Sequence, residues 1–131
     1  MMRLARGQRF LALFVSGALL PLSLAPFYFW PIAIVSMAVL FRNLQEQTPK
    51  QALAKSLVFG FGMFFAGASW VYVSIHEHGF VPAPMALIAT SLFCLFIAVL
   101  FALPFVLSAL TPQNPASWLI GLPSIWVLSE W

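Results

Sequence analysis

Charged residues are scarce in this chain of 131 residues. It has 6 Lys or Arg and 3 Asp or Glu residues, so 7% of it is charged, whereas an ordinary globular domain is about 25% charged. Hydrophobic residues make up 63% of the chain and the mean hydropathy is +1.00. A water-soluble surface cannot be assembled from this composition, and a net charge of +3 is too small and too scattered for a nucleic-acid surface. The composition therefore predicts a protein embedded in membrane lipids, with no nucleic acid among its partners.

Lys and Arg are absent from the chain after Lys55. The six cations fall into two groups, one before the first apolar run and one around the second polar segment: Arg3, Arg6 and Arg9, then Arg42, Lys50 and Lys55. Because loops rich in Lys and Arg stay in the cytoplasm, the N-terminus and the 42–55 loop are predicted to be cytoplasmic. The 76–84 loop, which has Glu77 and no cation, is then predicted to face outward.

Cysteine occurs once, at Cys94, so no internal disulfide can form. A catalytic thiol needs a neighbour that lowers its pKa or accepts its proton, and no His, Lys or Glu lies within several helical turns of Cys94. Cys94 instead belongs to a ridge of small residues at four-residue steps: Ala86, Thr90, Cys94, Ala98 and Ala102. Such ridges let membrane helices approach closely. We expect Cys94 to pack, with a nucleophilic or acylated thiol as the alternative.

Five apolar stretches follow one another along the chain, near residues 10–25, 27–41, 53–75, 84–110 and 116–131. A transmembrane helix needs about 20 apolar residues. The pattern predicts an all-α membrane protein, a polytopic helical bundle with about four complete transmembrane helices and part of a fifth, in one N-terminal transmembrane region (1–131). The first two stretches are short, so we expect a shallow or mutually tilted hairpin with a tight outward turn at Ala25-Pro26.

The first stretch also has features of a signal peptide. Basic residues precede a short apolar core, and Ser23-Leu24-Ala25 resembles a cleavage site. Pro26 would directly follow the cut, however, and Pro21 interrupts the core. We therefore interpret this stretch as an uncleaved helix.

The third and fourth stretches carry complementary packing signals. Thr48-Pro49 is a suitable helix start, with a capping threonine and proline at the first helical position. Gly60, Gly67 and Ser74 recur every seven residues and would share one side of a continuous helix. We expect this side to pack against the small-residue ridge, so that Ala98→Leu would loosen the contact. Pro104 offers a place where the long fourth helix can bend.

Aromatic and polar side chains gather where the third stretch ends: Trp70, Tyr72, His76, Glu77 and His78. Two imidazoles and a carboxylate within three residues could bind zinc or act as acid and base. Metal sites on a helix usually have ligands at i and i+4, and no further ligands are evident, so a polar outward loop is the simpler interpretation. We expect no metal and no cofactor. A third interpretation is that His76 makes hydrogen bonds within a larger site that another domain completes.

Glu130 is the last candidate residue. A carboxylate at membrane depth is costly and is a functional candidate by default, although a residue next to a C-terminus need not be buried. The chain ends inside a hydrophobic run without a polar flank. This ending suggests a truncated longer protein.

Three segments resemble, in order and spacing, the N-terminal membrane region of the bacterial apolipoprotein N-acyltransferase family: 22–40, 60–79 and 123–131. The resemblance rests on three motifs: Ala25-Pro26-Phe27 with Trp30-Pro31, then Trp70-x-Tyr72-Val73-Ser74-Ile75-His76, then Trp126 followed by Glu130-Trp131. His78 is a departure, since the family usually has Phe before this Gly. The arginine that follows Glu130-Trp131 in the family is also absent.

The resemblance implies a multi-pass enzyme of the bacterial inner membrane that completes lipoprotein maturation. Its substrates would be a phospholipid acyl donor and a diacylated lipoprotein acceptor, and a cysteine in a nitrilase-like periplasmic domain, assisted by a glutamate and a lysine, would carry the acyl group. That domain would follow Trp131, and Cys94 matches none of its catalytic residues, so this chain alone is expected to be inactive. The remaining candidates for contact with lipid or with that domain are Trp70, Tyr72, His76 and Glu130. The alternative is a small non-enzymatic scaffold or interaction protein of the inner membrane.

Overall fold

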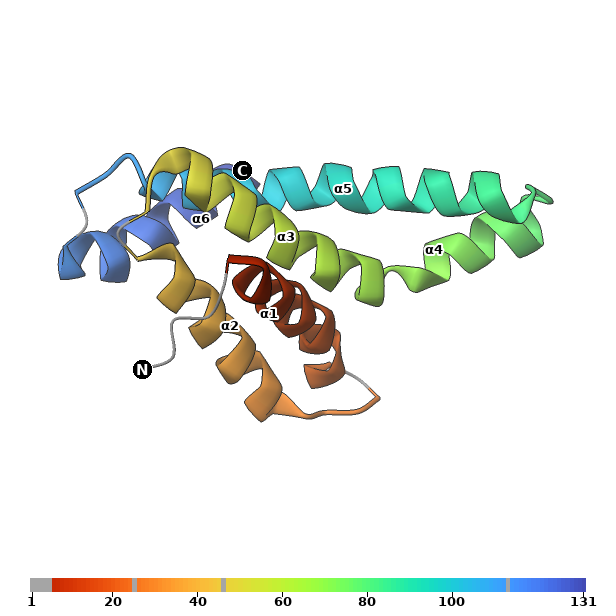
Figure 1. The fold of residues 1–131 in the computed structure, drawn as a ribbon, viewed down its shortest axis with the longest axis horizontal. Helices are drawn as coiled ribbons and strands as arrows, with labels where there is room; N and C mark the ends of the chain where they lie inside the picture. Colours follow the sequence, from red (N-terminus) through yellow and green to blue (C-terminus); the bar gives the residue numbers. More distant parts are fainter. Residues whose placement is uncertain (1–5, 25, 46, 113) are drawn as a thin grey trace.

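The computed structural model describes residues 6–24, 26–45, 47–112 and 114–131 and is all-helical over them (Figure 1). These residues form six α-helices: α1 (Arg6–Leu19), α2 (Trp30–Leu44), α3 (Pro49–Gly67), α4 (Ser69–Val73), α5 (Ala83–Ser108) and α6 (Leu122–Glu130). A 3₁₀ turn, η1 (Leu20–Ser23), extends α1, and two π-helical turns, η2 (Ser74–His78) and η3 (Ser117–Gly121), follow α4 and precede α6. The described part contains no β-strand, so the all-α prediction is confirmed.

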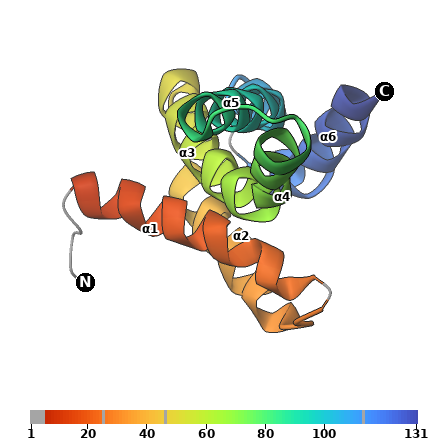
Figure 2. The same ribbon diagram turned by 90° about the vertical axis from the view of Figure 1, so that its right-hand side faces the viewer.

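Helix α3 is the centre of the fold because α1 packs against one of its sides and α5 against another (Figures 1 and 2). Helices α1 and α2 form the short hairpin expected from the first two stretches, and α6 packs on α5. Phe59 and Phe105 are almost fully buried in the shared core. Aromatic rings connect its layers: the Phe101 ring lies 6.1 Å from that of Phe59 and 5.3 Å from that of Trp126.

The N-terminus of α3 begins as expected. Thr48 caps the helix and Pro49 occupies its first turn. The Gln51 amide nitrogen donates to the Thr48 hydroxyl oxygen at 3.4 Å, and the Thr48 amide donates to the Gln51 side chain at the same distance. This reciprocal pair is a capping box, which satisfies two backbone donors that the helix itself leaves free.

The third stretch is not the single helix expected over 53–75. Helix α3 ends at Gly67, Ala68 leaves helical geometry at φ −103° and ψ 21°, and the axis turns by 55° into α4 (Figure 1). Glycine is a weak helix former, and a β-carbon on Gly67 would lie 3.3 Å from the Pro21 ring of η1. The break therefore lies where α3 passes the end of the first hairpin.

The break removes Ser74 from the side of the helix that Gly60, Gly67 and Ser74 were expected to share. A β-carbon on Gly60 would contact Phe101 and Ala98 of α5, whereas one on Gly67 would contact Pro21. Ser74 lies beyond the break, in η2. The seven-residue spacing places Gly60 and Gly67 on one side of α3, but α5 covers that side at Gly60 and Pro21 covers it at Gly67.

The ridge on α5 is buried throughout: Ala86, Thr90, Cys94, Ala98 and Ala102 are at most 2% exposed. Gly60 lies opposite this ridge, since its β-carbon would be 3.5 Å from the Ala98 Cα atom. The Thr90 hydroxyl oxygen is buried and has no hydrogen-bond partner among the described residues. Pro104 lies inside α5 without ending the helix.

One described helix, α5, is long and apolar enough to cross a membrane, and the bent pair of α3 with α4 and η2 would be a second if it forms one span. The other apolar helices are shorter than a full crossing. The expected count of about four complete spans is therefore not supported by helix length. Helix α1, for example, has 14 residues, or about 21 Å at 1.5 Å per residue, against about 30 Å of hydrocarbon.

Some expected features lie outside the described residues. Arg3 and Ala25 are not described, and neither are the side chains of Arg6 and Glu130. The turn after η1 is described on both sides of Ala25: the Phe27 and Tyr28 amides donate to the Leu24 carbonyl at 3.1 and 3.0 Å. The chain therefore turns back tightly near the position expected from Ala25-Pro26.

Candidate functional site

The aromatic and polar residues predicted as a candidate site lie on the short arm formed by α4 and η2. Residues 70–78 all belong to α4 or to the π-helical turn η2. At the end of η2 the Gly79 amide donates to the Ser74 carbonyl at 3.1 Å and so closes a five-residue step. A β-carbon on Gly79 would lie 2.6 Å from the Ile75 carbonyl oxygen, so this closure requires glycine. π-Helical turns occur frequently at functional sites.

His76 connects this arm to the segment before α5. Its Nδ1 atom lies 2.8 Å from the Val81 carbonyl oxygen. Because a carbonyl can only accept, Nδ1 carries the proton, and in the neutral ring Nε2 is left as an acceptor. The Tyr72 ring stacks on the imidazole with centroids 5.6 Å apart. The structure therefore brings Tyr72 and His76 together and fixes the orientation of the histidine ring.

The other polar residues of the arm do not join His76 in a metal site. Glu77 and His78 are exposed, and no three His, Cys, Asp or Glu side chains within the described ranges are grouped so that they could hold a metal ion. Trp70 is on the same arm with 66% of its surface exposed. The chemistry available at this tip is hydrogen bonding by His76 and contact through aromatic surface.

The end of α6, where Glu130 lies, is away from this arm (Figure 1). Helix α6 is attached instead to the core, with the Trp126 ring 5.5 Å from that of Phe105. The backbone arrangement therefore does not bring Glu130 to the Tyr72–His76 pair.

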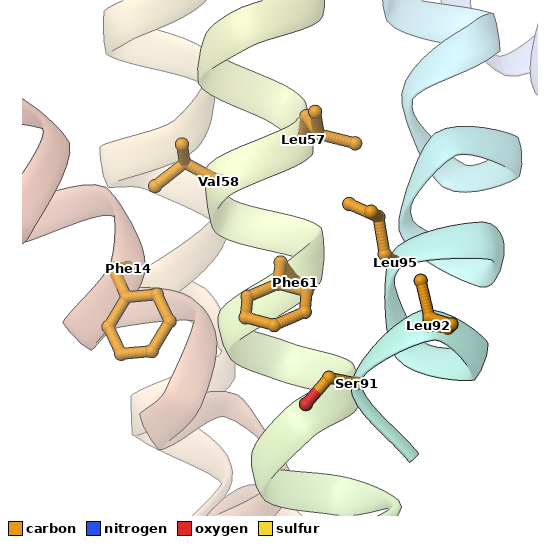
Figure 3. Close-up of a pocket in the computed structure, with 7 residues that line it drawn as sticks. All are labelled: Phe14, Leu57, Val58, Phe61, Ser91, Leu92 and Leu95. Carbon is orange, nitrogen blue, oxygen red and sulfur yellow. The ribbon is translucent and has the colours of Figure 1, made fainter. Parts of the chain in front are cut away.

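Sequence analysis missed an apolar groove between α1, α3 and α5 (Figure 3). It has a volume of about 340 Å³ and is lined by Phe14, Leu57, Val58, Phe61, Ser91, Leu92 and Leu95. Phe61 of α3 lies in its middle, with Phe14 on one side and Leu92 and Leu95 on the other. The groove suits hydrocarbon and carries no acid, base or nucleophile other than the Ser91 hydroxyl. No local signal could have indicated it, because its residues come from three helices.

Comparison with known proteins identifies the family. The sequence model of the apolipoprotein N-acyltransferase N-terminal domain matches residues 16–131, which include the Tyr72–His76 arm and all the residues that line the apolar groove except Phe14. The chain belongs to the apolipoprotein N-acyltransferase family. The resemblance inferred from the three sequence motifs is thereby confirmed.

Individual relatives support the same family assignment. An apolipoprotein N-acyltransferase of Pseudomonas syringae is 48% identical over 89 residues, which are 68% of this chain and 18% of that protein. The apolipoprotein N-acyltransferase of Coxiella burnetii is 42% identical over 120 residues, 89% of this chain and 25% of that protein. That of Vibrio cholerae is 35% identical over 117 residues, 88% of this chain and 23% of the relative. The chain thus spans a quarter or less of the length of these apolipoprotein N-acyltransferases.

Proposed function

We propose that this chain is the N-terminal membrane region of an apolipoprotein N-acyltransferase, which transfers an acyl chain from a phospholipid to the N-terminal diacylglyceryl-cysteine of a lipoprotein. In this reaction the phospholipid ester bond breaks and an amide bond forms at the lipoprotein amine, whose proton passes to the released lysophospholipid alcohol. The single observation that supports this proposal best is the family match over residues 16–131.

The chain would act as a multi-pass platform in the bacterial inner membrane. Helix α5 supports this role, since Ile88, Leu92 and Phe96 along it are each at least 60% exposed and would be unfavourable in water at about 25 cal/mol per Å² of apolar surface. The distribution of Lys and Arg favours a cytoplasmic N-terminus. In this orientation the arm formed by α4 and η2 faces outward.

The catalytic residues would lie outside these 131 residues. Cys94 is fully buried in the α3–α5 interface and is therefore inaccessible to a substrate. The groove lined by Phe61 and Leu92 offers apolar contact, and His76 offers one oriented acceptor, but neither supplies a nucleophile with a base. We therefore propose that the chain alone has no acyltransferase activity and that Trp70, Tyr72, His76 and Glu130 contact lipid or the remainder of the enzyme.

A chimera tests the proposal. The chain replaces the matching N-terminal segment of the Coxiella burnetii relative, and N-acylation of a diacylated lipoprotein is measured with purified protein in phospholipid. We expect activity from the chimera and from the unaltered relative, which is the control, and none from the 131-residue chain alone.

Two results would count against the proposal. A chimera that inserts and folds like the relative yet shows no activity would favour the non-enzymatic scaffold. Turnover by the 131-residue chain alone would show that its own residues carry the reaction.

A further inference from the structure

Two non-glycine residues within the described ranges have positive φ: Tyr28 at 56° and Phe80 at 52°. This left-handed conformation is uncommon, and for a bulky residue it is a genuine outlier. Such strain persists where the surrounding structure enforces it, and it is concentrated at functional sites. Both residues are aromatic, and each lies in a turn between two helices.

The strain is not compensated by packing within the chain, because the Tyr28 side chain is 71% exposed and that of Phe80 is 91% exposed. Backbone hydrogen bonds hold both turns in place. The Trp30 amide donates to the Tyr28 carbonyl at 2.9 Å. Around Phe80, the Gly79 amide donates to Ser74 and the His76 ring to the Val81 carbonyl. Each turn therefore holds an aromatic ring away from the body of the protein.

The turn after η1 lies at the free end of the α1–α2 hairpin, and the turn before α5 lies at the tip of the arm formed by α4 and η2 (Figure 1). Successive helices reverse direction, so the turn after η1 and the turn before α5 are both opposite the 45–48 connection. The cations of α2 and α3, which are Arg42, Lys50 and Lys55, are near that opposite connection. Further exposed aromatic side chains flank the two turns: Phe27, Phe29, Trp30 and Trp70 are each at least 58% exposed.

We propose that Tyr28 and Phe80 are paired anchors that insert into the outward lipid–water interface of a phospholipid bilayer. The inference rests on the membrane placement in the proposed function and goes beyond it by naming the residues that contact lipid at this depth. Aromatic side chains are enriched at membrane–water interfaces, where their apolar rings meet the headgroup region. The strained turns keep the two rings exposed to that layer.

A lipid surface fits better than a protein surface because the exposed apolar area does not stop at the tip. It continues from Phe80 along α5 through Met85, Ile88 and Phe96, which are each at least 60% exposed. A protein partner resting on the tip would leave the α5 part of this surface uncovered, whereas a bilayer covers both. Glu77 and His78 on the same tip are exposed polar side chains that suit the aqueous side of the interface.

Site-directed fluorescence in phospholipid nanodiscs tests this assignment. Single cysteines replace Tyr28 or Phe80 in a Cys94→Ala background and carry an environment-sensitive fluorophore. Leu100→Cys, on the exposed side of α5, is the control for a label within the hydrocarbon region, and Gln45→Cys is the control for a label in water. Quenching is compared for aqueous iodide and for lipids with a nitroxide at a shallow or a deep carbon.

We expect the labels at Tyr28 and Phe80 to lose most emission to the shallow nitroxide, the Leu100 label to the deep nitroxide and the Gln45 label to iodide. Iodide quenching at Tyr28 or Phe80, combined with lipid quenching at Leu100, would contradict the anchoring role of the two residues but would agree with the membrane placement. Labels at the two turns that neither quencher reaches would indicate a protein cover and would also overturn the inference. Iodide quenching at Leu100 would reject the membrane placement and the anchors together.

A second variant separates the anchors from the fold. Glycine adopts positive φ without the strain that it imposes on Phe80. The thermal midpoint of the Phe80→Gly variant in detergent should therefore be equal to or above that of the unaltered chain. A fluorophore at Tyr28 in the Phe80→Gly variant should lose less emission to the shallow nitroxide, since one of the two anchors is missing. Unchanged quenching at Tyr28 would argue against a paired action.

Discussion

The closest approach between α1 and α3 depends on two glycines that face the backbone of the opposite helix. A β-carbon on Gly17 would overlap the Phe59 carbonyl oxygen, and one on Gly62 would overlap the Phe14 carbonyl oxygen. A flexible side chain could move aside, but a helical carbonyl cannot move without shifting its whole helix. Small residues at such crossings are the usual means of helix association in membranes.

Gly17→Ala and Gly62→Ala should each destabilise the protein by about 1–3 kcal/mol, the usual effect of overpacking. Gly7→Ala is the matched control, because nothing lies within 4 Å of its β-carbon position, and alanine is the better helix former by about 1 kcal/mol. The measurement is the free energy of unfolding in mixed detergent, followed by circular dichroism. Equal effects at Gly7 and Gly17 would refute the close crossing.

Lys55 of α3 connects this helix to the end of α2 through hydrogen bonds. Its Nζ atom donates to the Asn43 carbonyl oxygen and to the Gln47 side-chain oxygen, both at 2.8 Å. The Asn43 carbonyl belongs to the last turn of α2, where carbonyls have no partner within the helix. A lysine near a helix C-terminus satisfies such a carbonyl and also interacts favourably with the helix dipole.

Lys55→Met keeps most of the apolar stem and removes both hydrogen bonds, so it should lower the free energy of unfolding by about 1.5–3 kcal/mol. Lys50→Met is the control, since Lys50 is an exposed cation in the first turn of the same helix. Thermal unfolding in detergent measures both variants. If the two substitutions had the same effect, net charge rather than the contact with Asn43 and Gln47 would explain the result.

At the scale of elements, the α3–α5 interface is built from side chains that are small on both helices. Gly60 meets Ala98, and Phe101 stacks against Phe59 beside this contact with the two rings inclined by 16°. The small pair lets the helices approach, and the aromatic pair fills the space next to it. A larger side chain at Ala98 must therefore displace Phe101 or separate the helices.

Ala98→Leu should lower the thermal midpoint in detergent, with a loss of about 1–3 kcal/mol in unfolding free energy. Val99→Leu is a suitable control because Val99 is the next residue on α5 and is 39% exposed, whereas Ala98 is fully buried. The prediction fails if Ala98→Leu leaves the midpoint unchanged or shifts it no further than Val99→Leu does.

At the scale of the whole molecule, the proposed membrane placement predicts which connections share a side of the membrane. With a cytoplasmic N-terminus, the connection between α2 and α3 is cytoplasmic and the tip between η2 and α5 is outward. The break between α3 and α4 does not change this assignment, because the 55° turn redirects the chain without reversing it.

Cysteine accessibility in intact spheroplasts checks this orientation. In a Cys94→Ala background, Glu77→Cys should react with a membrane-impermeant maleimide, while Gln45→Cys should react only after permeabilisation. Both positions are exposed in the folded chain, so a difference between them reports the side of the membrane. Labelling of Gln45 but not Glu77 in intact spheroplasts would reverse the proposed topology.

The sequence by itself determined the helical class, the family and the buried ridge on α5. These follow from composition, from short motifs and from a four-residue period, all of which are local properties. It also indicated the Tyr72–His76 arm, because aromatic and polar residues interrupt an apolar run there. The hydrogen bond from His76 to Val81 had no signal of its own, since it depends on how the turn folds back.

The tertiary structure alone decided the break at Ala68, the groove around Phe61 and the crossing of Gly17 with α3. Gly60 and Gly67 share a seven-residue spacing, yet one faces α5 and the other faces Pro21. A sequence period assigns residues to a face of one helix, but it does not say which neighbour covers that face or where a contact with another element ends the helix. Those outcomes depend on residues far apart in the chain, which meet only when the helices pack.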